Sequence, residues 1–483
     1  LLRYVLDLRD GGTKVDDAAL DAALRAMVRG WEPSVEEALI SLGEDSRAPA
    51  LASRYAPQFP MAYRSDCGPR EAALDILRLR DLDSPDRHGA RLYRRADDDA
   101  QHLRLKLYSL TGAIPLSETV PALENFGFDV LEEVPPQLGK DDSGHIHDFL
   151  LHLRGQGDTE ALMLRAGAIE AAIAGTLEGK AENDPFNRLI AATGLEQRAV
   201  IWLRAWYRYL RQAGLPYGIG TVVDALHDAP GIAHALVALF IARHDPAFTG
   251  DREAETEAKL AAINTGLTRV SAIDDDRLLR MFRSLVMAIL RTNAFAPAAT
   301  LAMVMKIDSA KVPGLPAPLP WREMFVYSPQ VEGIHLRAGP VARGGLRWSD
   351  RRDDFRTEVL GLMKAQRVKN AVIVPTGAKG GFFPKQLPDP TTDREGWLTG
   401  GKDAYKTFIR TLLSITDNII DGKVVHPADV VVHDGEDPYF VVAADKGTAT
   451  FSDTANSIAA EFGFWLGDAF ASGGSQGYDH KAM

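Results

Sequence analysis

The sequence predicts a multi-domain protein in which an α+β part, a helical part and an α/β part follow one another. Three observations lead to this prediction. The chain has 483 residues, which is too long for a single hydrophobic core. Its periodicity changes along the chain from mixed, to helical, to alternating strands and helices. The proline-rich segment KVPGLPAPLPWREMF at 311–325 cannot continue a helix, and it separates the last two patterns.

The composition is that of an ordinary globular protein, with 46% hydrophobic and 25% charged residues. A formal net charge of -11 argues against a general nucleic-acid binder. Cys67 is the only cysteine, which excludes an intramolecular disulfide and a cysteine-based zinc site, and we expect no metal. Without a long apolar run or a signal-like leader, we predict a cytoplasmic protein that makes no membrane contact.

The N-terminal part of the sequence contains two patterns. Residues 1–95 mix short helical segments with connectors rich in arginine and aspartate. Residues 96–157 contain the strand-like run HLRLKLYSL, the helix-like PLSETVPALENFGF, and two further alternating runs, DVLEEVPPQL and SGHIHDFLLHLRG. They predict a small α+β module of regulatory type. His145, His147 and His152 lie in the last run, and we expect them at the surface because no third ligand type accompanies them.

The C-terminal two thirds divide at the prolines. Residues 158–312 are helical in pattern, with segments such as EQRAVIWLRAWYRYLRQAG and DDRLLRMFRSLVMAILRTNAFA. From 320 to 483 the strand-like runs MFVYSP, GIHLRAG, AVIVP, DVVVHDG and YFVVAADKG alternate with helical patterns at 351–369 and about 402–421. This alternation predicts an α/β domain, and ligands gather at the strand ends of such domains.

Candidate binding groups appear first in ARGGLRWSD, residues 342–350. Gly344 and Gly345 would let the backbone approach a ligand closely, and Arg343 offers a planar pair of donors to a carboxylate. The alternative is an exposed loop. In the helix that follows, the apolar face ends at Gln366, and Lys369 would continue this face into the interior. The alternative for Lys369 is a cation that reaches solvent near a helix C-terminus.

Two further segments carry chemically useful side chains. In VIVPTGAKGG we expect a strand and then a turn that presents Lys379 between Gly377 and Gly380. This segment matches neither a Walker A sequence nor GxGxxG, so it is a poor phosphate cradle. In VVAADKGTATFSD, Asp445 ends a predicted strand. This position suits a general acid or base held by a rigid strand, and the alternative is an N-cap of the following helix. Cations at 343, 369 and 379 suit a substrate with two carboxylates, and we expect Lys379 to transfer protons or activate water.

These motifs resemble a known family. The run GPVARGGLRWSDRRDDFRTEVLGLMKAQRVKNAVIVPTGAKGGF, followed by VVAADKGTATFSD, closely resembles the large, NAD-specific class of bacterial glutamate dehydrogenases. The small glutamate, leucine and phenylalanine dehydrogenases share the frame K-G-G-x-R, a lysine, G-G-x-K-G-G and D-x-G-T. The resemblance implies that 320–483 is a substrate-binding α/β domain of that type, that 96–157 is an ACT-like module, and that 158–312 is the preceding helical region.

The resemblance also assigns roles. Arg343 would hold the substrate's side-chain carboxylate in place of the small-class lysine, and Lys369 would hold the α-carboxylate. Lys379 and Asp445 match the catalytic lysine and aspartate. The implied reaction is the oxidation of L-glutamate to 2-oxoglutarate and ammonium with NAD as cofactor, in a homo-oligomer.

The glycine-rich NAD fingerprint of the family is not found in this sequence. We therefore expect a fragment that is cut at both ends, and at its C-terminal end before the Rossmann domain. We expect it to be inactive alone, and we can name no NAD-binding residues in it. Two alternatives stay open. One is a non-catalytic regulatory piece that binds an effector or a partner subunit. The other is a phosphate-binding domain that uses TGAKGG.

Overall fold

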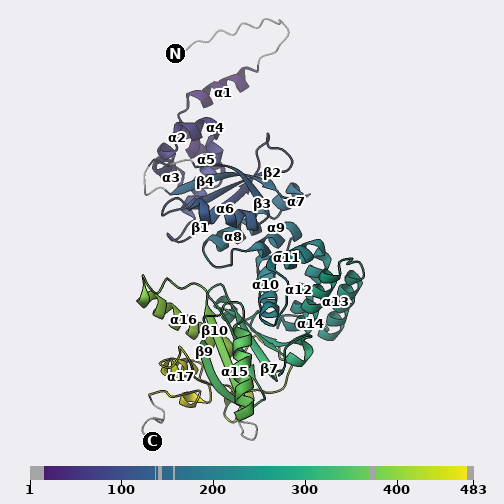
Figure 1. The fold of residues 1–483 in the computed structure, drawn as a ribbon. Coiled ribbons are helices and arrows are strands. Elements are labelled where there is room, and N and C mark those ends of the chain that lie inside the picture. The colour runs from purple at the N-terminus through teal and green to yellow at the C-terminus, as the bar shows by residue number, and fades with distance from the viewer. Residues whose placement is uncertain (1–15, 136–137, 140–143, 156–157, 370–375, 476–483) are drawn as a thin grey trace. The chain divides into compact units, whose positions relative to one another are not determined.

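The computed structural model describes residues 16–135, 138–139, 144–155, 158–369 and 376–475, and the side chains of 22, 23, 26–28 and 367–369 lie outside this description (Figure 1). The chain forms two compact units. One contains the residues up to Glu124 together with Phe128–Glu178, and the other contains Asn125–Gly127 and the chain from Gly179 onward. Each unit is described by itself.

The first unit combines helices with an antiparallel sheet whose strand order is β1-β2-β4-β3. Its elements are α1 (Asp17–Val28), α2 (Trp31–Ser41), α3 (Ala48–Tyr55), α4 (Met61–Asp66), α5 (Pro69–Arg80), β1 (His88–Tyr93), β2 (His102–Ser109), α6 (Leu116–Asn125), β3 (Phe128–Val134), β4 (His145–Leu153), α7 (Thr159–Met163) and α8 (Ala166–Leu177). The strand, the helix and the two further strands predicted for 96–157 are present as β2, α6, β3 and β4. The sheet also includes β1, which begins before the predicted module boundary at 96.

One histidine of this unit differs from expectation. His147 is 4% exposed, not at the surface. Its Nε2 accepts a hydrogen bond from the backbone N–H of Ile114, and its Nδ1 lies 2.8 Å from Glu133 Oε1. Because strand β4 has both faces partly covered, an alternating polar position does not guarantee solvent exposure. These two hydrogen-bond partners explain how a histidine is buried at this position.

The second unit begins with helices and continues into a sheet. Its helices before the sheet are α9 (Arg188–Thr193), α10 (Gln197–Gln212), α11 (Ile219–Asp228), α12 (Pro230–His244), α13 (Arg252–Leu267) and α14 (Ile273–Ala288). None of the described helices is by itself long and apolar enough to cross a membrane, although the bent pair α11 and α12 passes that test together.

The helical prediction for 158–312 is wrong after Ala288. Residues Ile289–Thr292 and Met303–Ile307 are strands β5 and β6, every residue of which is buried. A short apolar run such as ILRT has the same composition in a buried strand as in a buried helix, so periodicity could not separate the two. Both strands belong to the C-terminal sheet, which therefore starts well before residue 320.

The described strands of this sheet have the order β14-β13-β9-β10-β8-β7-β6-β5. Strands β9, β10, β13 and β14 are parallel neighbours, and β5 to β8 are antiparallel, as is the β8–β10 pair. The remaining elements are β7 (Arg322–Tyr327), β8 (Val331–Arg337), β9 (Ala342–Trp348), α15 (Phe355–Lys369), β10 (Thr376–Pro384), α16 (Arg394–Leu413), β11 (Asn418–Ile420), β12 (Lys423–Val425), β13 (Val441–Ala444), α17 (Ser452–Glu461) and β14 (Ala471–Ser472).

Several expectations for this part need correction. TGAKGG lies within strand β10 and is not the predicted turn, and ARGGLRW forms strand β9, which excludes the alternative of an exposed loop. Their glycines are needed because the strands lie so close that a side chain on Gly344 would overlap the carbonyl group of Ala378. DVVVHDG forms no strand, and the helix predicted at about 402–421 is α16, which ends at Leu413. The predicted strand AVIVP lies outside the described residues.

Helices α15 and α16 cover opposite faces of β10. A side chain on Gly381 would lie 2.8 Å from Val359 of α15, whereas the next residue, Phe382, stacks on Phe408 of α16. Because alternate residues of a strand point to opposite faces, Gly377, Lys379 and Gly381 share the face toward α15. Figure 1 shows α15 running along β9 and β10.

Buried charges join α10 to the sheet and to the start of α15. Glu323 of β7 and Arg356 of α15 are both 0% exposed, and their side chains form two hydrogen bonds, 2.9 Å and 2.6 Å long. The Tyr209 hydroxyl of α10 donates to the same carboxylate at 3.2 Å. The N-terminal end of α15 is therefore held in place from two sides, by α10 and by the sheet.

Candidate active site

Lys379 and Asp445 form an ion pair across the strand that separates them. Lys379 lies in β10 and Asp445 directly follows β13, and both strands neighbour β9. Lys379 Nζ is 2.7 Å from Asp445 Oδ2, and the two side chains are 14% and 16% exposed. The sequence singled out both residues, and the structure brings them together on one face of the sheet.

Gly345 of β9 makes this pair possible. A Cβ atom at this position would lie 3.0 Å from Asp445 Cβ and 3.3 Å from Lys379 Nζ, so a side chain there would stand between the two charged groups. We expected Gly345 to let a ligand approach the backbone closely. In the structure it lets the side chains of Lys379 and Asp445 approach each other across β9. Because Gly345 has no side chain, Lys379 and Asp445 can meet directly over β9.

Asp445 is fixed by its surroundings. Its Oδ1 accepts a hydrogen bond from the Lys446 backbone N–H at 2.7 Å, and its own N–H donates to Thr448 Oγ1 at 3.0 Å. The Thr448 hydroxyl in turn donates to the carbonyl of Leu346 in β9. Partial burial would raise the pKa of Asp445, but the hydrogen bonds from Lys379 and Lys446 outweigh it and lower that pKa below the ordinary value. The carboxylate is thus ionised and oriented.

A second cation at the site, Arg347, was not singled out from the sequence. Its Nη2 lies 3.4 Å from Asp445 Oδ1, and its Nη1 donates to Glu358 Oε1 of α15 at 2.9 Å. Glu358 Oε2 accepts from the Ser349 hydroxyl at 2.7 Å. The one sequence signal for Arg347 was its place as the last residue of the frame K-G-G-x-R, four residues after Arg343.

Arg343 lies on the same face as this pair. It precedes Gly345 by two residues in β9, so strand alternation directs its side chain to the side of Lys379. Arg343 is exposed, and among the described residues its guanidinium makes no side-chain hydrogen bond or ion pair. A planar donor group with no described partner, on the same face as a half-buried lysine and carboxylate, suits a ligand that carries its own carboxylate.

The structure gives no side-chain contact at the site for the two other predicted residues, Gly344 and Lys369. Gly344 packs against β10 and adds no side chain to the face. Lys369 is the last residue of α15, but its side chain lies outside the described residues. Within the described part of the chain no group of three or more His, Cys, Asp and Glu residues could hold a metal ion.

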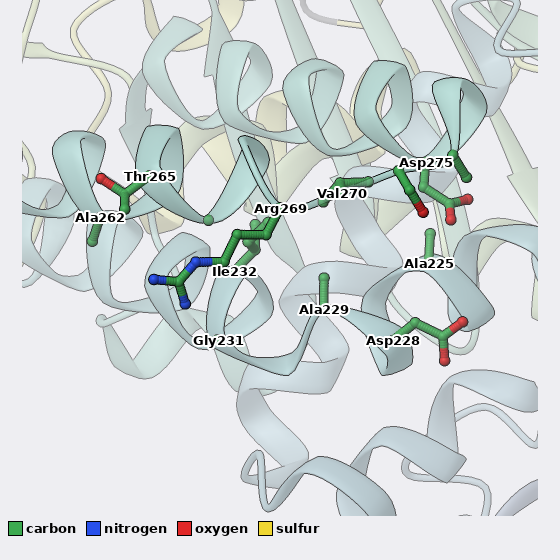
Figure 2. Close-up of a pocket in the computed structure, with 13 residues that line it drawn as sticks. Ala225, Asp228, Ala229, Gly231, Ile232, Ala262, Thr265, Arg269, Val270 and Asp275 are labelled. Carbon is green, nitrogen blue, oxygen red and sulfur yellow. The ribbon is translucent and has the colours of Figure 1, made fainter.

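A larger cavity lies elsewhere in the second unit. It has a volume of about 670 Å³ and is formed by α11 to α14. Figure 2 shows Arg269 extending toward Gly231, while Asp228 and Asp275 lie at the other end. Burial, and then the charge of Asp228, raises the pKa of Asp275. No residue of the Lys379 site lines this cavity, so the two are separate features.

Comparison with known proteins gives four family matches along the chain. Residues 262–483 match the bacterial NAD-glutamate dehydrogenase catalytic domain, and 181–246 match glutamate dehydrogenase helical motif 3. Residues 87–163 match the glutamate dehydrogenase ACT3 domain, and 38–82 match helical motif 2.

Three relatives are each described as an NAD-specific glutamate dehydrogenase. The protein from Halomonas elongata is 45% identical, over 100% of this chain and 30% of the relative. Those from Pseudomonas aeruginosa and Mycobacterium tuberculosis are 44% and 41% identical, over 97% and 96% of this chain and 29% of each relative. This chain therefore spans less than a third of the length of the relatives it matches.

Proposed function

Because this chain belongs to the bacterial NAD-glutamate dehydrogenase family, we propose that it contributes the substrate site of an enzyme that oxidises L-glutamate. The reaction converts L-glutamate, NAD and water into 2-oxoglutarate, ammonium, NADH and a proton. The observation that carries the proposal is the pair of Lys379 and Asp445 over Gly345, in which a lysine and an ionised carboxylate lie 2.7 Å apart.

In this proposal the two charged groups have different tasks. The Asp445 carboxylate accepts a proton from the substrate's amino group, which an ionised acceptor does best. The Lys379 ammonium polarises the oxygen that develops on the reacting carbon, and it orients the attacking water. Substrate binding separates the pair, since each group exchanges its present partner for a group of the substrate.

Arg343 is proposed to bind the side-chain carboxylate of glutamate, because it is exposed on the face that holds the reacting groups and pairs with no described side chain. Gly344 and Gly345 keep the backbone close to the substrate. The assignment of Lys369 to the α-carboxylate stays a prediction.

The cofactor of the proposed enzyme is NAD, which would supply the hydride-accepting chemistry when bound. The described residues contain no glycine-rich turn between a strand and a helix of the kind that cradles a dinucleotide. The residues present therefore do not fit the cofactor, and we assign none of them to it. Every role above concerns substrate atoms only.

We also propose the division of the chain into domains. The small sheet includes β1 and the large sheet includes β5 and β6, which supports a module that starts before His88 and a catalytic part that starts before Ile289. A cytoplasmic location and a homo-oligomeric state stay predictions.

Replacing Arg343 by methionine tests substrate recognition. In the complete protein that contains this chain, we expect the KM for L-glutamate to rise about 100-fold, because a charge-assisted contact is lost. Turnover of an amino acid without a side-chain carboxylate, such as L-norvaline, should not fall. The measurement is NADH formation at varied substrate concentration, with Arg351→Met as a control because Arg351 is exposed and pairs with its neighbour Asp354. Equal losses for both substrates would contradict the assignment.

Replacing Gly345 by alanine tests the space above β9. The added Cβ would press on Lys379 and Asp445, so we expect kcat to fall about tenfold or more through misplacement of the reacting groups. Gly361→Ala is the matched control, since a Cβ there meets nothing within 4 Å. If the two variants have the same kcat, Gly345 does not shape the site.

A further inference from the structure

The strongest unassigned feature of the second unit is the contact between α15 and Asp445 through Arg347. The two oxygens of Asp445 have different partners. Oδ2 faces Lys379 Nζ, whereas Oδ1 faces the Lys446 backbone N–H and Arg347 Nη2. When Lys379 turns to the substrate, Oδ2 becomes free and Oδ1 keeps both of its partners.

Arg347 is itself held firmly. Its side chain is 19% exposed, and Glu358, its partner on α15, is 15% exposed. Glu358 is occupied at both oxygens, by Arg347 and by the Ser349 hydroxyl. A partly buried, charge-assisted pair of this kind fixes the guanidinium in one orientation, unlike the exposed pairs of the surface.

We propose that Arg347, oriented by Glu358, is a positioning residue that holds Asp445 by Oδ1 so that Oδ2 points at the substrate's amino group. This inference rests on the proposed function, because it concerns the proton acceptor of that reaction. Arg347 acts through Asp445 and touches neither the substrate nor the cofactor. Because Glu358 lies on α15, the orientation of the proton acceptor depends on how that helix packs against β9.

Replacing Arg347 by methionine in the complete protein tests the proposal. We expect kcat for glutamate oxidation to fall roughly 10- to 100-fold, as for other small misplacements of a reacting group. The KM for glutamate should change less than about threefold, since no substrate contact is removed. Arg347→Lys should restore part of kcat, and Glu358→Gln should lower kcat less than Arg347→Met does. Arg351→Met should change neither constant.

The pH profile gives a second readout. Asp445 is faced by Lys379 from β10, by Arg347 from β9 and by the backbone N–H of Lys446, with Glu358 of α15 behind Arg347. The carboxylate must be ionised to accept a proton, so kcat/KM falls as pH drops through the pKa of Asp445. Loss of the Arg347 cation raises this pKa. The acidic limb of kcat/KM should therefore move to higher pH in Arg347→Met and move back in Arg347→Lys.

The outcomes separate this inference from the proposed function. No NAD-dependent glutamate oxidation by the wild-type complete protein would overturn both. An active wild type together with an Arg347→Met variant that raises KM and keeps kcat would overturn only this inference, by making Arg347 a substrate ligand. An unchanged acidic limb would also overturn it. If Arg347→Met does not fold, Glu358→Gln decides, because an unaltered kcat and acidic limb in that variant contradict the proposal.

Discussion

Replacing Lys379 by alanine should reduce NAD-dependent glutamate oxidation by roughly 10³-fold or more, the largest effect on activity expected for any residue here. The change removes the ammonium that contacts Asp445 Oδ2 and with it the group proposed to polarise the reacting carbon's oxygen. Folding and assembly should be retained, because Asp445 keeps the Lys446 N–H and Arg347 as partners. The measurement is kcat of the complete protein, with the thermal unfolding midpoint as a check.

The matched control is Lys406→Ala. Lys406 lies in α16, its side chain is 35% exposed and it pairs with Asp403 three residues away, so its loss should leave kcat unchanged. The same experiment separates the alternatives. A regulatory fragment predicts equal activity for Lys379→Ala and wild type, and a phosphate site at TGAKGG predicts that inorganic phosphate binds wild type and not the variant. Either result would remove Lys379 from the proposed chemistry.

The sequence predicted which side chains form the site better than it predicted the secondary structure that carries them. Lys379 and Asp445 were found because each is flanked by glycine and small residues in motifs shared with a known family, and the structure places them 2.7 Å apart. Asp445 was expected at the end of a strand, and it directly follows β13. TGAKGG was expected to be a turn, since glycine pairs favour turns in isolation. In the structure the same glycines serve close strand packing, which depends on neighbouring strands that a local pattern does not contain.

Arg347 shows a second limit of local reasoning. Its importance comes from a hydrogen bond to Glu358, eleven residues later on α15, and from an approach to Asp445, which directly follows another strand, β13. Neither contact leaves a periodic signal in the sequence. Strands β5 and β6 were missed for a related reason, because burial on both faces removes the alternation by which a strand is recognised.

The stability of the same region should depend on Glu323. We expect Glu323→Leu to lower the free energy of unfolding of the second unit by about 3–5 kcal/mol, because it leaves the Arg356 guanidinium buried without its carboxylate. Burial alone would lower the pKa of Arg356, but the hydrogen bond to Glu323 raises it above the ordinary value, so the arginine is charged and the loss is not relieved by deprotonation. Tyr209 and Ser309 would lose an acceptor as well.

Two comparisons make this expectation specific to a buried pair. The double variant Glu323→Leu/Arg356→Met should recover most of the loss, since an apolar pair of similar volume replaces both charges. Glu461→Gln, which breaks an exposed pair with Arg410, should cost less than about 1 kcal/mol. Denaturant unfolding, combined with amide hydrogen exchange of α10 and α15, measures the effect. Because Arg356 is two residues before Glu358, faster exchange at the start of α15 should accompany a lower kcat. An unchanged exchange rate in α15 would show that Glu323 does not hold the helix that orients Arg347.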